Sequence, residues 1–187
     1  AIWNNAAGTV TVSDGKVTAS GSSGKAIYNY DAGGTVNVSG GTVEATDPNA
    51  IAIYNVNTGT VNVSGGTVSA AAGNAIYNVS TGKITISNNA TVTSANTNDG
   101  TIYLFAVPSS GESKVVLDIQ GGTVQNTADP AGYSVYFADA SGVTAANLGT
   151  YYSHTGGTVG RLYPAAVELL DSCLLYTSPS PRDYAAS

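Results

Sequence analysis

A short motif that recurs about every 25 residues constrains this chain more than any other feature of its sequence. It reads Ala-Ile-Trp-Asn at residues 1–4 and Ala-Ile-Tyr-Asn at residues 26–29, 52–55 and 75–78. Successive copies start 25, 26 and 23 residues apart, and weaker copies follow at Thr101-Ile102-Tyr103 and Ser134-Val135-Tyr136. Internal repeats of this length are typical of solenoid and propeller architectures, so the repeat restricts the fold class.

Two further motifs follow each copy of the first one. The second reads Gly-Thr-Val-Asn-Val-Ser, as at residues 34–39 and 59–64, and the third reads Gly-Thr-Val, as at residues 41–43 and 66–68. Apolar and polar residues alternate in these runs, and Val, Ile, Thr and Tyr favour extended backbone. Each repeat therefore predicts three short strands separated by corners that are rich in Gly, Asn, Asp and Ser.

A unit of three short strands cannot bury its own apolar face, but it can do so against identical neighbours. A propeller blade needs roughly 40–50 residues, whereas a solenoid coil needs about half that length. We therefore predict an all-β fold, a single-stranded right-handed parallel β-helix (β-solenoid) of about six coils of roughly 25 residues. The alternation places Ile51 and Ile53 inside the coil, and Ala52 and Tyr54 outside it.

The later repeats are longer than the early ones. The third motif recurs at Thr91, Thr123 and Thr158, so its spacing rises to 32 and then 35 residues. We assign the extra residues to corner loops near 108–112 and 129–132, where Pro and Gly favour turns. Residues 1–163 are predicted to form one uncapped solenoid domain, followed by a poorly defined end at 164–172 in which a short helix could begin.

The last fifteen residues, 173–187, differ in composition from the rest of the chain. The run from Cys173 to Asp183 is similar, residue for residue, to one reading frame of a transposon-based sequencing-library adapter. We interpret 173–187 as an artefactual, disordered tail and leave it out of the fold prediction. The only cysteine of the chain lies in this tail, so no disulfide or thiolate site is expected.

Low charge restricts the classes of partner. The chain has 6 Lys and Arg and 12 Asp and Glu residues, which gives a net charge of −6. A protein that binds nucleic-acid phosphates needs a basic face, so no nucleic-acid partner is expected. No apolar run reaches the roughly 18 residues of a membrane-spanning helix, so we expect no membrane insertion by this segment.

The Gly-Gly-Thr-Val and Ala-Ile-Tyr-Asn units resemble the right-handed parallel β-helix of the pectin-lyase-like superfamily, and more narrowly the repetitive stalks of large bacterial surface proteins. The resemblance covers residues 1–125 well and residues 126–163 loosely. It implies a secreted or surface-anchored bacterial protein that continues into further repeats outside the cell. It also implies an asparagine ladder, here Asn4, Asn29, Asn55 and Asn78, a residue type that tolerates the left-handed backbone of a sharp turn.

One column of aromatic residues is the candidate binding site. Its members take the third position of the first motif in successive repeats, and they are Trp3, Tyr28, Tyr54, Tyr77, Tyr103 and Tyr136. Outward rings suit the apolar face of a sugar, which makes glycans a candidate partner. Cross-strand aromatic pairs also stabilise a sheet by about 0.2–1 kcal/mol each, so a purely structural ladder is the favoured interpretation and glycan binding the alternative.

The sequence predicts no catalytic residue, no metal site and no cofactor. His154 is the only histidine, and acidic residues do not recur at one position, because Glu44 aligns with Ser69, Thr93 and Gln125. The leading hypothesis is a non-catalytic structural or adhesive repeat segment, since near-identical coils serve length and multivalent display. The alternative is a fragment of a polysaccharide lyase or glycoside hydrolase, whose paired carboxyl groups would lie within about 5–10 Å. Its candidates are Glu112, Asp118, Asp129 and Asp139.

Overall fold

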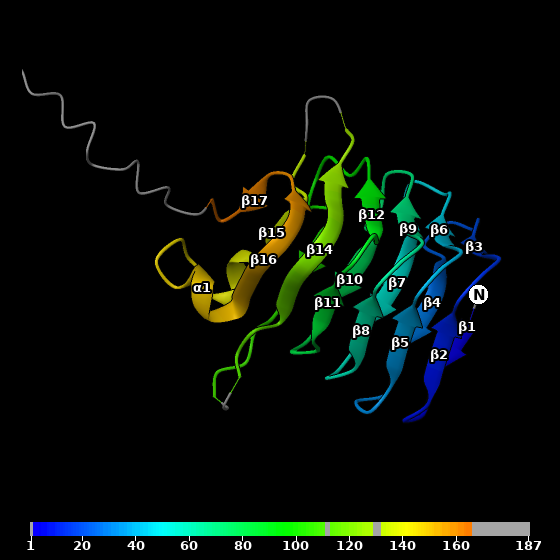
Figure 1. The fold of residues 1–187 in the computed structure, drawn as a ribbon, viewed down its shortest axis with the longest axis horizontal. Helices are drawn as coiled ribbons and strands as arrows, with labels where there is room; N and C mark the ends of the chain where they lie inside the picture. Colours follow the sequence, from blue (N-terminus) through cyan, green and yellow to red (C-terminus); the bar gives the residue numbers. More distant parts are fainter. Residues whose placement is uncertain (1, 111–112, 129–131, 166–187) are drawn as a thin grey trace, which may run out of the picture.

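The computed structural model describes residues 2–110, 113–128 and 132–165, and nearly all regular structure in this part of the chain is β. A seven-stranded sheet and a ten-stranded sheet contain all of these strands, and every pairing is parallel between successive repeats. The chain is therefore a β-solenoid of about six turns, drawn in Figure 1 with its first coil at one end and its last at the other. The predicted all-β solenoid fold is confirmed.

Each turn contributes three strand segments, which we assign to faces A, B and C. Face A is the seven-stranded sheet, and its strands are β1 (Ile2–Asn4), β4 (Lys25–Asn29), β7 (Ile51–Asn55), β10 (Ile76–Asn78), β13 (Ile102–Leu104), β15 (Val135–Phe137) and β17 (Leu162–Tyr163). Face B contains β2 (Thr9–Val12), β5 (Thr35–Val38), β8 (Thr60–Val63) and β11 (Ile84–Ile86). Face C contains β3 (Lys16–Ala19), β6 (Thr42–Ala45), β9 (Thr67–Ala70) and β12 (Thr91–Ser94).

Two longer strands join faces B and C in the last coils. They are β14 (Leu117–Asn126), which pairs with both β11 and β12, and β16 (Tyr152–Val159), which pairs with β14. These strands make faces B and C a single ten-stranded sheet. Two short helical turns, η1 (Asp139–Ser141) and α1 (Leu148–Tyr151), lie between β15 and β16.

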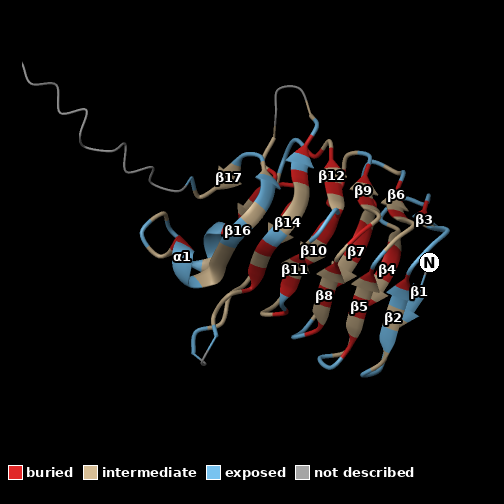
Figure 2. Ribbon diagram, in the orientation of Figure 1, coloured by how far each residue is buried: buried red, intermediate tan, exposed pale blue. Residues whose placement is uncertain are grey.

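Equivalent residues of successive coils stack directly on one another. Val36 of β5 pairs with Val61 of β8, and Val61 pairs with Ile84 of β11. These three side chains are fully buried, as are most inward positions of the middle coils (Figure 2). The strands are short because each ends where the solenoid turns a corner, so the core is a set of aliphatic columns between the three faces.

The predicted alternation fails at the start of the face A strands. Ile53 is fully buried and Tyr54 half-buried, as expected, but Ala52 is fully buried and Ile51 is only half-buried. The expected positions of Ile51 and Ala52 are therefore wrong. Two consecutive residues are enclosed where the chain enters this face from a corner, so counting back in steps of two from Ile53 misplaces both.

The asparagines of the first motif form a buried ladder. Asn4 Nδ2 donates a hydrogen bond to Asn29 Oδ1 at 2.8 Å, and the same bond at 2.7 Å joins Asn29 to Asn55 and Asn55 to Asn78. Asn29, Asn55 and Asn78 are fully buried at the ends of their strands. The predicted ladder is confirmed, but the predicted left-handed backbone is wrong, since these residues end strands and none has a positive φ.

Each ladder asparagine also holds the corner that follows it. Asn55 Nδ2 donates to the carbonyl of Gly59 at 2.8 Å, and Asn29 and Asn78 bond Gly34 and Gly82 in the same way. A Cβ at Gly59 would overlap Asn29 Nδ2 and would lie 2.8 Å from Asn55 Oδ1. The glycine that opens the second motif is therefore required because the amides of two coils occupy the place of its side chain.

Corner length follows the ladder. The corner from face A to face B spans residues 5–8, 30–34, 56–59 and 79–83 in the four coils that carry the asparagine. Leu104 and Phe137 take the asparagine position in the next two coils, and there the connection spans residues 105–116 and 138–151. We infer that the side-chain bond to the glycine carbonyl keeps the corner short, since both coils without it have long connections.

The largest insertion was not foreseen in the sequence. It is the 138–151 connection that contains η1 and α1, whereas the predicted loops lay near 108–112 and 129–132. The 108–112 loop falls within the 105–116 connection. Most of the predicted loop at 129–132, most of the 164–172 segment and the whole predicted tail 173–187 lie outside the described residues.

Substituting an inward valine should destroy the stacking. We expect Val38→Asp to unfold the chain or to lower its free energy of unfolding by more than about 4 kcal/mol, because it buries an unpaired charge. The control is Asn37→Asp, which introduces the same charge at the neighbouring outward position. In the wild type Asn37 Oδ1 accepts a hydrogen bond from Asn62 Nδ2 at 2.9 Å, and an aspartate oxygen can accept the same bond. Urea denaturation, monitored by circular dichroism, measures the stability of both variants. Equal stability of the two would contradict the inward assignment of Val38.

Substituting the corner glycine should also destabilise the fold. We expect Gly59→Ala to cost about 1–3 kcal/mol, since the added methyl group overlaps the ladder amides. Gly149→Ala is the control, because apart from its chain neighbours and the backbone of its own helix no atom lies within 4 Å of the place its methyl group would take, and alanine is the better helix former. Thermal denaturation should lower the Tm of the first variant only; equal Tm values would show that the amides do not fill this corner.

Candidate aromatic binding surface

The aromatic column lies along the outside of face A. The strand register pairs Trp3 with Tyr28, and each later ring with the next along the column. Ring centroids of neighbours lie 4.6–6.0 Å apart, the shortest separation being that between Tyr77 and Tyr103. All six predicted residues therefore form one continuous column, which we call the ring column.

Three of the five ring contacts are stacked, with interplanar angles of 7° to 30°. The other two, Tyr28 with Tyr54 and Tyr77 with Tyr103, are tilted at 43° and 34°. Stacked and tilted pairs at these separations are both favourable arrangements of aromatic rings. The five tyrosines are half-buried, whereas Trp3 at the end of the column is 64% exposed. Each interior ring thus has both faces partly covered by its neighbours, and Trp3 has the most accessible ring.

Three further tyrosines extend the column. Tyr163 of β17 stacks on Tyr136 at 4.6 Å and 12°, Tyr133 contacts both of these rings, and Tyr30 contacts Tyr28 at 5.8 Å. Tyr163 is not among the six predicted residues because its segment reads Arg-Leu-Tyr-Pro instead of Ala-Ile-Tyr-Asn. The 27-residue distance from Tyr136 was the available signal.

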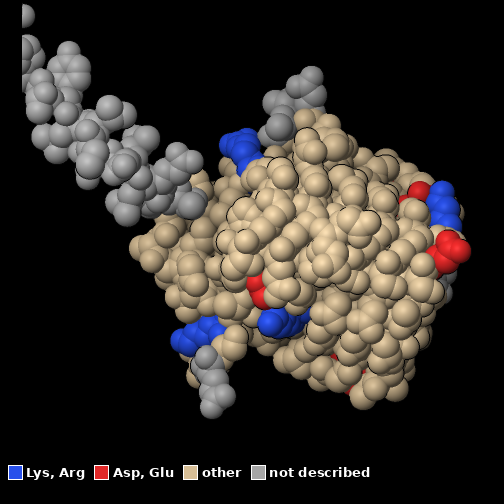
Figure 3. All heavy atoms as spheres, viewed as in Figure 1, with Lys and Arg blue, Asp and Glu red and all other residues tan. Residues whose placement is uncertain are grey.

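A few charged side chains border the ring column. Lys25 Nζ lies 5.3 Å from the centroid of the Tyr54 ring, and the Arg161 guanidinium lies 4.5 Å from that of Tyr133. At the far end, Tyr163 donates a hydrogen bond to Asp139 Oδ1 at 2.9 Å. Elsewhere charge is sparse, and the side of the molecule in Figure 3 shows only scattered charged side chains.

Packing also affects the phenol groups. Burial, with the neighbouring Tyr103, Tyr54 and Asp99, raises the pKa of Tyr77 to about 12. Burial and Asp99 raise the pKa of Tyr103, and burial raises the pKa of the Asp99 carboxyl itself. The hydrogen bond to Asp139 raises the pKa of Tyr163. These phenols of the column are therefore neutral donors and acceptors over the whole physiological range.

The acidic residues of the enzyme alternative do not gather at one described site. Asp118 lies on face B, where it accepts a hydrogen bond from Gln120 Nε2 at 2.8 Å. Asp139 lies in η1 after face A and is bonded to Tyr163. Glu112 and Asp129 lie outside the described residues. His154 is exposed on β16, 6.1 Å from the Tyr152 ring.

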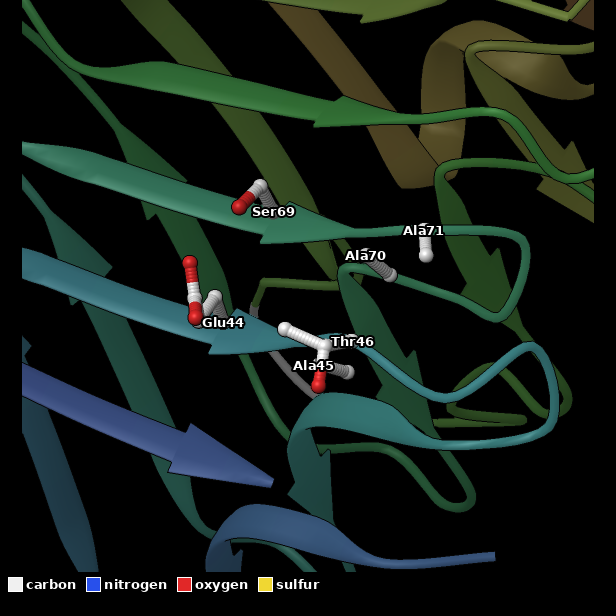
Figure 4. A pocket seen from close by; sticks show the side chains of 6 residues that line it. All are labelled: Glu44, Ala45, Thr46, Ser69, Ala70 and Ala71. Atoms are coloured by element: carbon white, nitrogen blue, oxygen red, sulfur yellow. The ribbon is translucent and has the colours of Figure 1, made fainter. Parts of the chain in front are cut away.

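Face C carries a shallow hollow of about 230 Å³ beside Glu44 and Ser69 (Figure 4). Glu44 Oε1 pairs with Lys16 Nζ at 2.8 Å and accepts a hydrogen bond from Thr18 Oγ1 at 3.3 Å. Ala45, Ala70 and Ala71 form much of the remaining lining. The only carboxylate at this hollow is already paired, and the other polar side chains of its lining are the hydroxyls of Thr46 and Ser69.

The part of the chain that the structure describes contains neither a candidate metal centre nor a candidate membrane helix. No group of three or more His, Cys, Asp or Glu side chains in this part of the chain is arranged to hold a metal ion. Within the same residues, no helix is long and apolar enough to cross a membrane.

In comparisons with known proteins, no family model matches this chain, and neither a curated protein nor a solved structure does.

The ring column predicts an unusual alkaline titration. We expect the Tyr77 phenol to ionise near pH 12 instead of near its ordinary pKa of 10. Since the pKa is raised in the folded state, the neutral phenol favours folding below pH 10, and stability falls as the pH rises from 10 towards 12. NMR of ¹³C-labelled tyrosine, with Tyr77→Phe to assign the signal, measures this pKa. Ionisation at pH 10 would show that the ring is not packed as described.

Proposed function

We propose that this chain is a non-catalytic structural or adhesive repeat segment of a secreted or surface-anchored bacterial protein. One observation carries the proposal: the same outward side-chain position is repeated in register at every turn, as the ring column shows from Trp3 to Tyr163. A surface of this kind presents many equivalent contacts along a line. Such repetition serves length and multivalent binding better than it serves one unique catalytic centre.

The stacking also supports a mechanical role. Six turns at the ordinary interstrand spacing span roughly 29 Å. The buried asparagine ladder, the aliphatic columns and the ring column all run along this axis, so each joins successive coils. Stacked aromatic pairs contribute about 0.5–1.5 kcal/mol each beyond the area they bury, which makes the ring column a stiffening element of face A.

A second candidate role for the ring column is the display of aromatic groups to glycans. The half-exposed rings and the cations of Lys25 and Arg161 beside them favour this role. Because interior rings cover each other's faces, a sugar would contact ring edges and phenol hydroxyls along the column, and an open ring face only at Trp3. We also propose that the chain is related to pectin-lyase-like β-helices and is located outside the cell. The support for this relationship is the β-solenoid architecture alone.

The display role is tested by glycan binding. The triple variant Tyr28/Tyr54/Tyr77→Ala should weaken binding on an immobilised glycan array by about tenfold or more, since it removes three adjacent rings. The matched control is Thr42/Thr67/Thr91→Ala, which removes a column of the same length from face C and should leave binding unchanged. Equal binding by the first variant and the wild type, with folding verified by circular dichroism, would exclude the ring column as the glycan site.

The non-catalytic assignment has its own test. Incubation of the chain with pectin, alginate and xylan should release neither new reducing ends nor unsaturated products. Release of either one, lost in Asp118→Asn or Asp139→Asn, would establish the enzyme alternative instead.

A further inference from the structure

The side chains that are most easily oxidised are concentrated at the ring column. The chain has no methionine and a single cysteine, which lies in the tail 173–187, but it has 12 tyrosines and one tryptophan. The tryptophan and most of the tyrosines lie in the column or against it. Outside that tail the chain therefore offers a one-electron oxidant aromatic rings and no sulfur atom.

The rings of Tyr136 and Tyr163 are well placed to couple with each other. Their centroids lie 4.6 Å apart and their planes differ by 12°. Two aryl rings joined by a direct C–C bond have centroids two ring radii and one bond apart, which is slightly less than this distance. Tyr77 and Tyr103 are equally close but are tilted by 34°, and the other neighbours in the column lie 5.3–6.0 Å apart. The strand register pairs Tyr136 directly with Tyr163, so coupling requires rotation of two side chains but no shift between strands.

Tyr163 also has a proton acceptor in place. Its hydroxyl donates to Asp139 Oδ1 at 2.9 Å, and no other tyrosine that the structure describes donates to the carboxylate of a described residue. A phenol that loses an electron becomes a strong acid, so a carboxylate at hydrogen-bond distance can take the proton as the electron leaves. This arrangement lowers the barrier to oxidation of Tyr163.

We propose that face A carries a site of oxidative cross-linking, at which Tyr136 and Tyr163 are joined as dityrosine. Two equivalents of a one-electron oxidant, such as the ferryl haem of a peroxidase or a photogenerated ruthenium(III) complex, each take one electron from a phenol. The proton of Tyr163 passes to Asp139 and that of Tyr136 to water. The two phenoxyl radicals then form a bond between ring carbons ortho to oxygen. The hydrogens on these carbons move to the two oxygens as protons, so the pair loses two electrons and two protons overall and keeps both hydroxyls.

The new bond joins neighbouring coils. It connects β15 to β17, which lie side by side in face A (Figure 1). Because the two rings are already in contact, coupling within one chain does not depend on an encounter between molecules. The proposal rests on the structural role proposed above, and it adds a covalent link between coils that are otherwise held together by packing and hydrogen bonds.

The test oxidises the full chain and maps the product. Dilute protein is treated with photogenerated tris(bipyridine)ruthenium(III), and the monomer is separated from cross-linked multimers. Cleavage after Lys and Arg places Tyr136 in the peptide 115–161 and Tyr163 in the peptide 162–182. We expect mass spectrometry of the monomer to show these two peptides joined, with the loss of two hydrogen atoms.

Phenylalanine variants identify the coupled residues, since they remove the hydroxyl and keep the shape of the ring. Tyr136→Phe and Tyr163→Phe should each abolish the joined peptides. The matched control is Tyr133→Phe, which alters the same peptide 115–161. The Tyr133 ring contacts both partners at 5.4–5.5 Å but is tilted by 58–59°, so the product should persist in this variant.

A fourth variant tests the carboxylate. In Asp139→Asn the amide oxygen can accept the same hydrogen bond but is too weak a base to take the proton. We expect the initial rate of formation of the joined peptides to fall by about tenfold or more. Loss of unmodified tyrosine from the peptide 26–83, which carries other rings of the column, should be unchanged and serves as the reference for equal exposure to the oxidant.

Three results would overturn the proposal. The first is a monomer in which the two peptides are not joined. The second is a product that survives Tyr136→Phe or Tyr163→Phe, or one that is lost in Tyr133→Phe. The third is an unchanged rate in Asp139→Asn. All are read from peptides of a single molecule, whereas the structural or adhesive role is judged from glycan binding and from the absence of released products, so the two proposals fail separately.

Discussion

The structure depends on one constraint: a single coil cannot bury its apolar side chains alone, and must stack on the coils directly above and below it. A residue in a solenoid coil therefore has its counterpart about 4.8 Å away, and often that counterpart is a copy of itself. The side chain must tolerate its own copy at this distance. Valine and isoleucine do so by packing, tyrosine by offset stacking, and asparagine because a single amide both donates and accepts.

The same requirement explains where charge is missing. A column of identical carboxylates or ammonium groups would place like charges at the interstrand spacing, which is unfavourable. The outward column of face C accordingly reads Thr18, Glu44, Ser69, Thr93 and Gln125, so its one acid has no acidic neighbour. Glu44 is instead paired with Lys16 of the coil before. Stacking of like positions thus disfavours charge in the repeats of this chain.

Much of this architecture could be predicted from the repeat, because residues that stack in one column recur in the sequence at a nearly constant spacing. Trp3 to Tyr136 were located in this way, as was the asparagine ladder. Tyr163 was missed because its neighbours depart from the motif, although its ring occupies the same column. The 138–151 insertion was missed because motif spacing shows that residues have been added but not at which corner. Nor does alternation reveal that Ala52 and Ile53 are both enclosed, since that depends on how the chain leaves a corner.

The packing of the ring column limits its own use as a binding surface. Contacts between neighbouring rings stabilise the column by covering parts of the ring faces, so the packing that stiffens face A also hides surface that a sugar would use. The five tyrosines from Tyr28 to Tyr136 are half-buried for this reason. A ligand that lies along face A would therefore contact ring edges and phenol hydroxyls, and contacts of this kind leave the packing of the rings intact.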